Sequence, residues 1–339
     1  MLTIGYIGNG KSANRYHVPY VLTRPNIAIK TMFPASDAAW DRIEGVHYTD
    51  DMDELLRDED IQLVVICTPP ATHYDLAVKA LNAGKNVLVE KPFTPTYRQA
   101  VELFELAERK GLVVQTYQNR RYDSDYLTVK KVIESGELGE LYEFVMTFDY
   151  WRPDTVLNSK HVAYYNTLYY GHTAHTLDQV IALFGEPDSI SYDVRNLCGP
   201  DKMNDYYDLD LRYGNLKVSI QSSYFRAHRR PAFCVYGKQG AFIKETPDRQ
   251  EEDLKRFYLP LGHDDFGMDA PEQYGTLYTR DSDGNELARA VPSERGDYGR
   301  VYDDLYEVIV NGAPKVITDD QTLLLMRLME EGAKSCGMV

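Results

Sequence analysis

The sequence predicts an α/β fold, with an N-terminal Rossmann domain built on a doubly wound sheet and a C-terminal α+β domain built on a large, mostly antiparallel open sheet. As far as about residue 120, short continuously apolar runs alternate with amphipathic segments, which is typical of parallel strands buried on both faces. Beyond that point apolar and polar residues alternate between turn formers, which is typical of antiparallel strands. We therefore expect domains at 1–120 and 121–339, with the C-terminal helices as candidates to pack back on the first domain.

The elements of the first domain follow from this alternation. Its strands are expected at 2–7, 27–33, 63–67, 87–90 and 112–115. Helices are expected at 74–82, ending at Gly84, and at 96–110, ending at Gly111. The second helix begins with Thr96 and Gln99 at the spacing of a capping box.

The second domain is expected to contain several strands and fewer helices. Strands are predicted at 140–150, 189–195, 207–213 and 216–225, with a hairpin turn at Gly214-Asn215 and a further turn at 237–240. The polar stretch 250–293 predicts loops with short strands. Helices are predicted at 125–135, 171–184, 301–310 and 320–333.

Composition and charge exclude several classes of function. The formal net charge of -15 and the pI of about 5.0 disfavour binding to nucleic acid. The chain has no apolar run of about 18 residues, so we expect no membrane-spanning helix, and its start reads as a strand rather than a signal peptide. The four cysteines are far apart and form no CxxC pair, which favours reduced thiols and a cytoplasmic protein without a structural metal.

A glycine-rich loop follows the first expected strand. Gly8, Gly10 and Ala13 are spaced as Gly-x-Gly-x-x-Ala, in which the first glycine allows a tight turn, the second lets backbone approach a pyrophosphate and the small third residue permits close helix packing. The loop therefore predicts a bound dinucleotide at Gly8, Gly10 and Ala13. The alternative is an ordinary turn between strand and helix.

The end of the second expected strand bears on the choice between NAD and NADP. NAD-binding chains usually place a carboxylate there for the ribose 2′-hydroxyl, but here the strand ends at Ser36 and the nearest acid is Asp37. Lys11 in the glycine loop is suited to a 2′-phosphate, so we favour NADP over NAD, with a solvent-exposed loop lysine as the alternative. Thr68 and Pro69, after the third strand, are expected to lie against the cofactor.

Two further segments carry groups suited to proton transfer. Glu90 and Lys91 follow an apolar strand, and ligands bind at the carboxyl ends of strands in open α/β sheets. The helix 171–184 presents His172 and His175 on one polar stripe. That stripe either faces a cofactor cleft or is an ordinary solvated face. A zinc site at His172, His175 and Asp178 is a third, less favoured reading.

These motifs, together with Gln118-Asn119-Arg120-Arg121-Tyr122-Asp123, resemble the Gfo/Idh/MocA oxidoreductases, near the NADP-linked scyllo-inositol dehydrogenases. The resemblance implies that Lys91 meets the substrate hydroxyl near the nicotinamide, that Glu90 lies near the cofactor ribose and that His175 is the catalytic histidine. It also implies that the open C-terminal sheet forms the interface of a homodimer or homotetramer. Many members carry an aspartate where this chain has Gly171, so Tyr170 or His172 is expected to substitute for it.

We therefore predict an enzyme that transfers hydride between NADP or NAD and a secondary alcohol of an inositol-like sugar or polyol. Asn119 is a candidate cofactor contact, and the candidate substrate contacts are Lys91, Arg121, Tyr150, Tyr170, His172 and His175. The alternatives are a glycosidase that retains NAD and a non-catalytic nucleotide sensor. The basic stretch 226–230 is suited to a carboxylated or phosphorylated substrate or to a partner subunit, although an exposed basic corner is the simpler reading.

Overall fold

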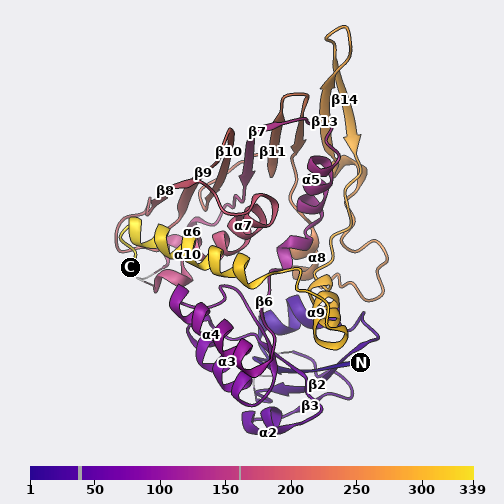
Figure 1. Cartoon of the computed structure of the whole chain (residues 1–339), viewed down its shortest axis with the longest axis vertical. Helices are drawn as coiled ribbons and strands as arrows, with labels where there is room; N and C mark the ends of the chain where they lie inside the picture. The colour runs from indigo at the N-terminus through magenta and orange to yellow at the C-terminus, as the bar shows by residue number, and fades with distance from the viewer. Residues whose placement is uncertain (37–39, 160–161) are drawn as a thin grey trace. The chain divides into compact units, whose positions relative to one another are not determined.

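The computed structural model describes residues 1–36, 40–159 and 162–339, and it divides into two compact units (Figure 1). Unit 1 comprises Met1–Asn119, Glu251–Phe266 and Asp297–Arg327, and unit 2 comprises Arg120–Gln250, Gly267–Gly296 and Leu328–Val339. The first join lies next to the expected boundary. The later segments 251–266 and 297–327 also belong to unit 1, and the second of them includes the helix predicted at 301–310.

Unit 1 contains a six-stranded parallel sheet in the order β3-β2-β1-β4-β5-β6. The central strand β4 is fully buried, as its apolar run predicted. The doubly wound Rossmann sheet is thus confirmed, each predicted strand lying within two residues of an observed one. The strands are β1 Leu2–Ile7, β2 Ile27–Phe33, β3 His47–Tyr48, β4 Leu63–Ile66, β5 Asn86–Val89 and β6 Val114–Thr116.

The predicted signals at the ends of α4 (Tyr97–Lys110) are confirmed. The Thr96 side chain accepts from the Gln99 backbone, and the Gln99 side chain accepts from the Thr96 backbone. Gly111 ends the helix at a φ of 63°. The other helices of this unit are α1 Val18–Val21, α2 Met52–Arg57, α3 His73–Asn82, α8 Gln250–Lys255 and α9 Arg300–Asn311.

The segment after the glycine loop differs from a regular α-helix. Residues 11–21 are helical, but Ala13–His17 forms a five-residue π segment before α1. π segments insert an extra residue into a helical turn and often occur at functional sites. Neither this segment nor the short elements β3 and α2 were predicted, because such short elements lack a full period of apolar residues.

Unit 2 contains an eight-stranded sheet in the order β14-β13-β12-β11-β7-β10-β9-β8. All neighbours are antiparallel except β7 and β10, which confirms the predicted mostly antiparallel sheet. Both predicted turns join hairpins, β9 to β10 and β11 to β12. The strands are β7 Leu141–Thr147, β8 Ser189–Arg195, β9 Tyr206–Tyr213, β10 Leu216–Ser223, β11 Phe233–Gly237, β12 Gly240–Lys244, β13 Gly275–Arg280 and β14 Glu286–Val291.

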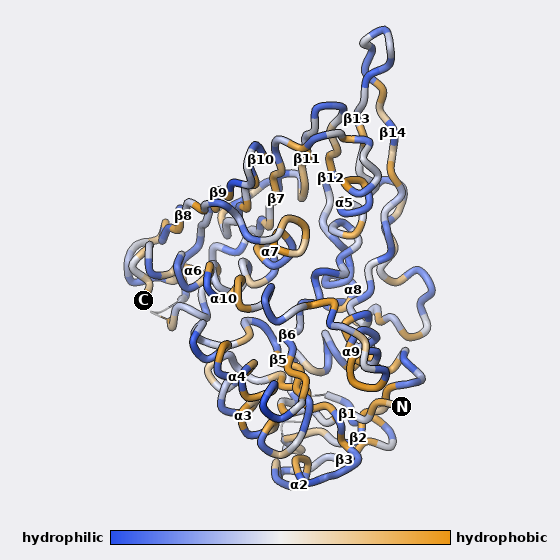
Figure 2. The backbone as a smooth tube through the Cα atoms, viewed as in Figure 1, coloured by the Kyte–Doolittle hydropathy of each residue, from blue (hydrophilic) through white to orange (hydrophobic). Residues whose placement is uncertain are grey.

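Helices pack against this sheet, α7 on β9 and β10 and α5 on β12. The tip of the β13–β14 hairpin is hydrophilic (Figure 2), and β14 is exposed over most of its length. No helix in the described ranges is long and apolar enough to cross a membrane. The helices are α5 Ser124–Glu134, α6 Pro153–Leu157, α7 Leu168–Phe184 and, continuing from unit 1, α10 Asp319–Ser335.

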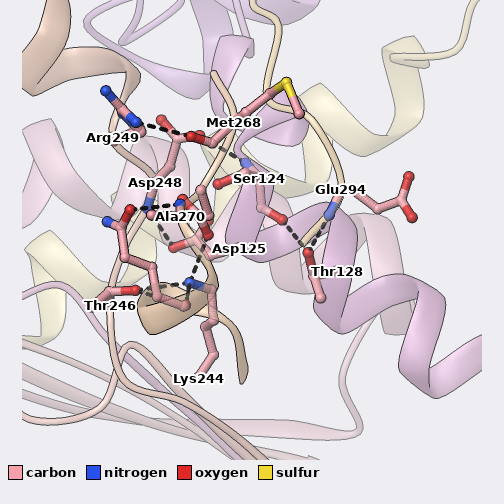
Figure 3. A network of polar contacts seen from close by, with 12 residues as sticks. Ser124, Asp125, Thr128, Lys244, Thr246, Asp248, Arg249, Met268, Ala270 and Glu294 are labelled. Carbon is pink, nitrogen blue, oxygen red and sulfur yellow. Dashed lines mark hydrogen bonds and ion pairs between the residues drawn. The ribbon is translucent and has the colours of Figure 1, made fainter. Parts of the chain in front are cut away.

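A buried polar network fixes the start of α5 (Figure 3). The Asp125 carboxylate accepts from the Asp248 backbone N–H at 3.1 Å, and the Asp248 carboxylate accepts from the Ser124 backbone N–H at 2.8 Å. In the same network Lys244 Nζ lies 2.8 Å from the Asp269 carboxylate, and both side chains are fully buried. These polar groups sit in the core of unit 2, although the apolar pattern gave no reason to expect charge there.

Candidate active site

The glycine loop has the geometry that a dinucleotide requires. Gly8 has a φ of 110°, and a Cβ atom there would lie 2.5 Å from the Cys67 carbonyl oxygen, so only glycine fits. Gly10 has open space where a side chain would stand, and Ala13 is fully buried. Backbone is thus accessible at Gly10, while the small Ala13 lets the following helix pack closely. These residues fit a pyrophosphate-containing cofactor.

Two asparagines hold this loop in shape. The Asn9 side chain donates to the Pro34 carbonyl at 3.2 Å. The Asn14 side chain donates to the Asn9 carbonyl at 3.1 Å and to the Gly10 carbonyl at 3.0 Å. The Gly10 carbonyl also accepts from the Asn14 backbone N–H at 3.2 Å, so the two side-chain amides add cross-links to a loop that is partly held by its own backbone.

The segment after β2 is bonded to a carboxylate that the sequence did not point to, Asp50, which follows β3. Asp50 accepts from both the backbone N–H of Ser36, at 3.0 Å, and its hydroxyl, at 2.9 Å. Hydrogen bonds from the Ser36 backbone and side chain lower the pKa of Asp50. Ser36 is therefore already bonded to an anion. Lys11 is exposed, and Asp37 lies outside the described residues.

The loop that contains Thr68 and Pro69 is tied to the segment that follows Lys91. His73 begins α3, and its buried ring lies 2.8 Å from the Thr68 carbonyl and 2.9 Å from the Pro92 carbonyl. One imidazole thus joins the ends of two neighbouring strands, β4 and β5. The structure gives His73 a positioning role for the loops at this end of the sheet.

Glu90 is the centre of a charged network in unit 1. Its carboxylate contacts His17 Nε2 at 3.0 Å, accepts from the Lys91 backbone N–H at 2.9 Å and accepts from the Ser12 hydroxyl. Burial alone would raise the pKa of Glu90, but the hydrogen bond and charge of His17, the charge of Lys91 and the Ser12 hydrogen bond together lower it to about 2. Glu90 is thus an ionised anchor that joins the glycine loop to the end of β5.

His17 is a residue that the sequence did not single out. Its fully buried ring stacks on Tyr117, with ring centroids 3.8 Å apart, and its Nδ1 atom lies 2.6 Å from the Tyr302 hydroxyl. Tyr302 in turn contacts the Tyr6 hydroxyl at 3.0 Å. No local pattern singles out His17, because residues 14–16 directly before it also carry polar groups. Its partners Glu90 and Tyr302 are 73 and 285 residues away.

Lys91 lies directly after β5, as predicted. It is half-buried, and β5 has β4 and β6 as its neighbours. The carboxyl end of such an inner strand is where open α/β sheets bind ligands. Asn119, the other predicted cofactor contact, is buried in unit 1 just after β6. The predicted cofactor residues of unit 1 thus occupy loops at the carboxyl ends of its strands, and their individual contacts with the cofactor remain predictions.

In unit 2 the helix α7 is buried on nearly all sides. His172 is 9% exposed and His175 is 5% exposed, so the alternative of a solvated histidine face is wrong. His172 Nδ1 lies 3.1 Å from the Ser222 hydroxyl. Its ring is surrounded by the rings of Phe148, Tyr150 and Tyr224, with centroids 4.9, 5.2 and 5.4 Å away. His175 follows one helical turn later, on the same side of α7.

Arg121 and Asp178 form a bidentate ion pair. Arg121 Nε and Nη2 lie 2.7 and 2.6 Å from the two carboxylate oxygens, and both side chains are buried. This pair attaches the segment after β6 to α7, three residues beyond His175. Asp178 was one of the three ligands of the alternative zinc site, and both of its carboxylate oxygens bind Arg121 instead. The described part of the chain contains no cluster of three His, Cys, Asp or Glu residues suited to a metal ion.

At the position of the missing family aspartate, Gly171 has open space where a side chain would stand. Tyr170, beside it, is fully buried against the ring of Tyr164, and its hydroxyl has no hydrogen-bond partner among the described residues. Contacts of Tyr150, Tyr170, His172 and Arg121 with a substrate remain predictions.

Comparisons with known proteins agree with this geometry. The model of the oxidoreductase family with an NAD-binding Rossmann fold matches residues 2–118, and that of the GFO/IDH/MocA C-terminal domain matches residues 126–243. The uncharacterized oxidoreductase YhhX of Escherichia coli is 43% identical over 98% of this chain and 96% of that protein. The scyllo-inositol 2-dehydrogenase (NADP(+)) IolW of Bacillus subtilis is 31% identical over 98% of this chain and 93% of that protein.

A crystal structure of an oxidoreductase from Bacillus cereus has the same fold, with a TM-score of 0.92 and 43% identity over 98% of this chain and 95% of that one. Family models thus match most of the chain, and relatives cover nearly all of it. The chain belongs to the Gfo/Idh/MocA family of oxidoreductases, with an NAD-binding Rossmann fold.

Proposed function

We propose that the protein is an NAD(P)-dependent dehydrogenase that interconverts a secondary alcohol and a ketone on a sugar or polyol. The observation that carries this proposal is the position of Lys91, at the end of β5 and next to the ionised Glu90 that contacts the glycine loop. The inositol dehydrogenases among its relatives support the substrate class.

Each chain residue has a defined task in this mechanism. A nicotinamide, when bound, supplies the hydride acceptor. The Lys91 ammonium stabilises the negative charge that develops on the substrate oxygen, and His175 accepts the hydroxyl proton. The Glu90 carboxylate accepts from the Lys91 backbone N–H and so fixes the backbone at Lys91. The ion pair of Arg121 with Asp178 fixes α7. In the reverse direction His175 returns the proton and the ketone is reduced.

The first test compares Lys91→Ala and His175→Ala with two surface controls, Lys110→Ala and His47→Ala. Both control residues are exposed. We expect turnover of polyols, measured by absorbance of the reduced nicotinamide, to fall by about 10²–10⁴-fold in the first two variants and to change little in the controls. Cofactor binding, measured by quenching of protein fluorescence, should persist in all four.

Unchanged turnover in both Lys91→Ala and His175→Ala would reject these roles. Cofactor binding without turnover of any polyol would favour a nucleotide sensor instead. Glycoside cleavage without net reduction of the cofactor would favour an NAD-retaining glycosidase.

We further propose NADP as the preferred cofactor, with Lys11 near its 2′-phosphate, in line with the NADP named for one relative. Asp50 opposes this preference, because its carboxylate is hydrogen-bonded to Ser36 and its negative charge would repel a 2′-phosphate there. We therefore expect Lys11→Ala to weaken NADP binding more than NAD binding, and Asp50→Asn to strengthen NADP binding. Titration by fluorescence measures both. Tighter NAD binding in the wild type, unaffected by Lys11→Ala, would contradict the preference.

We also propose that the eight-stranded sheet forms a homodimer or homotetramer interface. A hollow on this sheet is lined by aromatic and charged side chains, Tyr142, Tyr236, Tyr278 and Arg280 among them. Light scattering of the wild type and of Tyr142→Glu tests the assignment. A wild type that is monomeric at micromolar concentration would reject it.

A further inference from the structure

The segments that follow β7 and β10 form a rigid backbone platform in unit 2. Tyr150 N–H donates to the Ser223 carbonyl at 3.0 Å, and Arg152 N–H donates to the Tyr224 carbonyl at 2.8 Å. Arg226 N–H donates to the Tyr150 carbonyl at 3.2 Å. The pairing of β7 with β10 thus continues past the ends of both strands, and it fixes the positions from which the next side chains project.

Two arginines on this platform lie on aromatic rings. The Arg152 guanidinium is 4.0 Å from the centroid of the Tyr150 ring and 5.9 Å from that of Tyr224. The Arg229 guanidinium is 5.8 Å from the Tyr150 ring centroid. Stacking on a ring restrains a guanidinium without using its N–H donors, so the donors remain available to an anion. Neither arginine has a carboxylate within ion-pair distance in the described part of the chain.

The neighbouring arginines share a single carboxylate. Arg230 contacts both oxygens of buried Asp149, at 2.8 and 3.0 Å, and Arg226 approaches the same carboxylate at 3.9 Å. Asp149 is therefore neutralised by Arg230, and it leaves the charges of Arg152 and Arg229 uncompensated. A concentrated positive charge is unexpected on a chain whose net charge is -15.

This basic cluster (Arg152, Arg226, Arg229 and Arg230) borders the histidine helix. The rings of Tyr150 and Tyr224, on which Arg152 lies, also surround His172. His172 is one turn before His175 on α7. The two arginines without a carboxylate therefore stand one aromatic layer away from the helix that carries the proposed base.

We propose that Arg152 and Arg229 bind an anionic group, a carboxylate or a phosphate, on the sugar or polyol substrate. This inference rests on the proposed dehydrogenase function and narrows its substrate class to acidic sugars and polyols. Guanidinium groups recognise carboxylate and phosphate through paired N–H donors. The Tyr150 ring positions both guanidinium groups before the substrate arrives, which reduces the entropy lost on binding.

The test uses pairs of ligands that differ mainly in the anionic group. D-gluconate is paired with D-glucitol, D-glucuronate with D-glucose, and D-glucose 6-phosphate with D-glucose. Affinity is measured by isothermal titration calorimetry at constant ionic strength, so that charge screening is equal within each pair. We expect at least one anionic ligand to bind about 10–100-fold more tightly than its neutral partner, because hydrogen bonds to charged groups discriminate by this amount. The two carboxylate ligands and the one phosphate ligand together show which of these two anionic groups the site prefers.

The double variant Arg152→Met/Arg229→Met should abolish this preference and leave the affinity for the neutral ligands within about twofold. Arg195→Met is the matched control, because Arg195 is an exposed arginine of unit 2 on β8, paired with Asp193, and its loss lowers the net charge without touching the cluster. Anionic ligands that bind no more tightly than their neutral partners, or a preference that survives in the double variant, would overturn the proposal.

Turnover separates this proposal from the dehydrogenase function. If neutral polyols reduce the cofactor and no anionic ligand is preferred, only the anionic subsite is rejected. If the anionic ligands bind with the expected dependence on Arg152 and Arg229 but nothing reduces the cofactor, the subsite stands as a binding site and the dehydrogenase function is rejected.

Discussion

Two buried carboxyl groups, one in each unit, have opposite ionisation behaviour. Glu90 in unit 1 is 8% exposed and Asp125 in unit 2 is 5% exposed. Burial raises the pKa of both. Nevertheless the pKa of Glu90 falls to about 2, whereas that of Asp125 rises to about 7.

The neighbours of each group explain the difference. Glu90 has His17, Lys91 and Ser12 around it, which favour the charged form. Asp125 faces the carboxylate of Asp248, which adds to the effect of burial, and the charge of Lys244 and two backbone N–H donors only partly offset these effects. Burial thus strengthens the effect of neighbouring charges on the pKa of a carboxyl group, and the sign of the nearest charge decides whether the pKa falls or rises.

The largest effect is expected at the fully buried ion pair of Lys244 and Asp269, where a cation neutralises a carboxylate in the core of unit 2. Lys244→Met should lower the free energy of unfolding by about 3–5 kcal/mol, because it leaves a buried carboxylate without its cation. Urea unfolding measures this. The double variant Lys244→Met/Asp269→Leu should regain much of the loss. Lys238→Met, in an exposed pair with Glu140, should cost less than about 1 kcal/mol. Equal losses in both lysine variants would contradict the argument.

At Glu90, replacement by glutamine removes the charge but nearly preserves the shape. We expect Glu90→Gln to lower the free energy of unfolding at pH 7 by about 2–3 kcal/mol, since charge-assisted hydrogen bonds to His17 and Ser12 are weakened. This contribution requires pH above the unfolded-state pKa, and it is lost as pH falls from about 4.5 toward about 2. Glu108→Gln, at an exposed carboxylate on α4, is the control and should change stability little.

The pH dependence of Asp125 should have the opposite sign. Its pKa is about 7 in the folded state against 3.8 as the ordinary value, so between these values the folded chain holds a proton that the unfolded chain has released. Stability therefore falls as pH rises from about 4 to about 7. Relative to the wild type, Asp125→Asn should gain about 1–3 kcal/mol between pH 5 and pH 8, because the amide does not titrate. Urea unfolding at a series of pH values measures this gain, and parallel pH profiles for the two proteins would show that Asp125 is ionised throughout.

The smallest effect is expected at Tyr302, whose hydroxyl lies between His17 and Tyr6. Tyr302→Phe should cost about 1–2 kcal/mol, because His17 Nδ1 and the Tyr6 hydroxyl each lose a hydrogen-bond partner while the contact of His17 with Glu90 remains. Tyr306→Phe, on the same helix but not fully buried, is the control. Thermal unfolding of the two variants is the measurement. A loss as large as that of Glu90→Gln would mean that Tyr302, rather than the Glu90 carboxylate, organises the network.

Local signals in the sequence predicted the elements that position the site. The apolar runs placed the inner strands of the parallel sheet, and the Thr96 capping box and Gly111 marked the ends of α4. The glycine spacing predicted the loop in which Gly8 leaves no room for a side chain. Lys91 was found because a charged residue directly after a buried strand stands out. Backbone sterics and apolar periodicity act over a few residues, so the chain reports them directly.

These local signals could not predict contacts between residues far apart in the sequence. The contacts of His17 with Glu90, of Arg121 with Asp178 and of Ser36 with Asp50 join residues from separate elements, and each depends on strand order and helix placement. The sequence also left open whether the two histidines of α7 are buried, because the same polar helical stripe can face either water or a packed cleft.

By itself, then, the sequence determined the two sheets, the cofactor loop and the family, since these rest on local sterics and periodicity. Only the tertiary structure decided which charges are neighbours, and hence that Glu90 is ionised, that Asp125 holds its proton near neutral pH and that Arg152 and Arg229 share the Tyr150 ring. The physical reason is that electrostatic energy depends on distance in space and on burial, and neither is encoded in the separation along the chain.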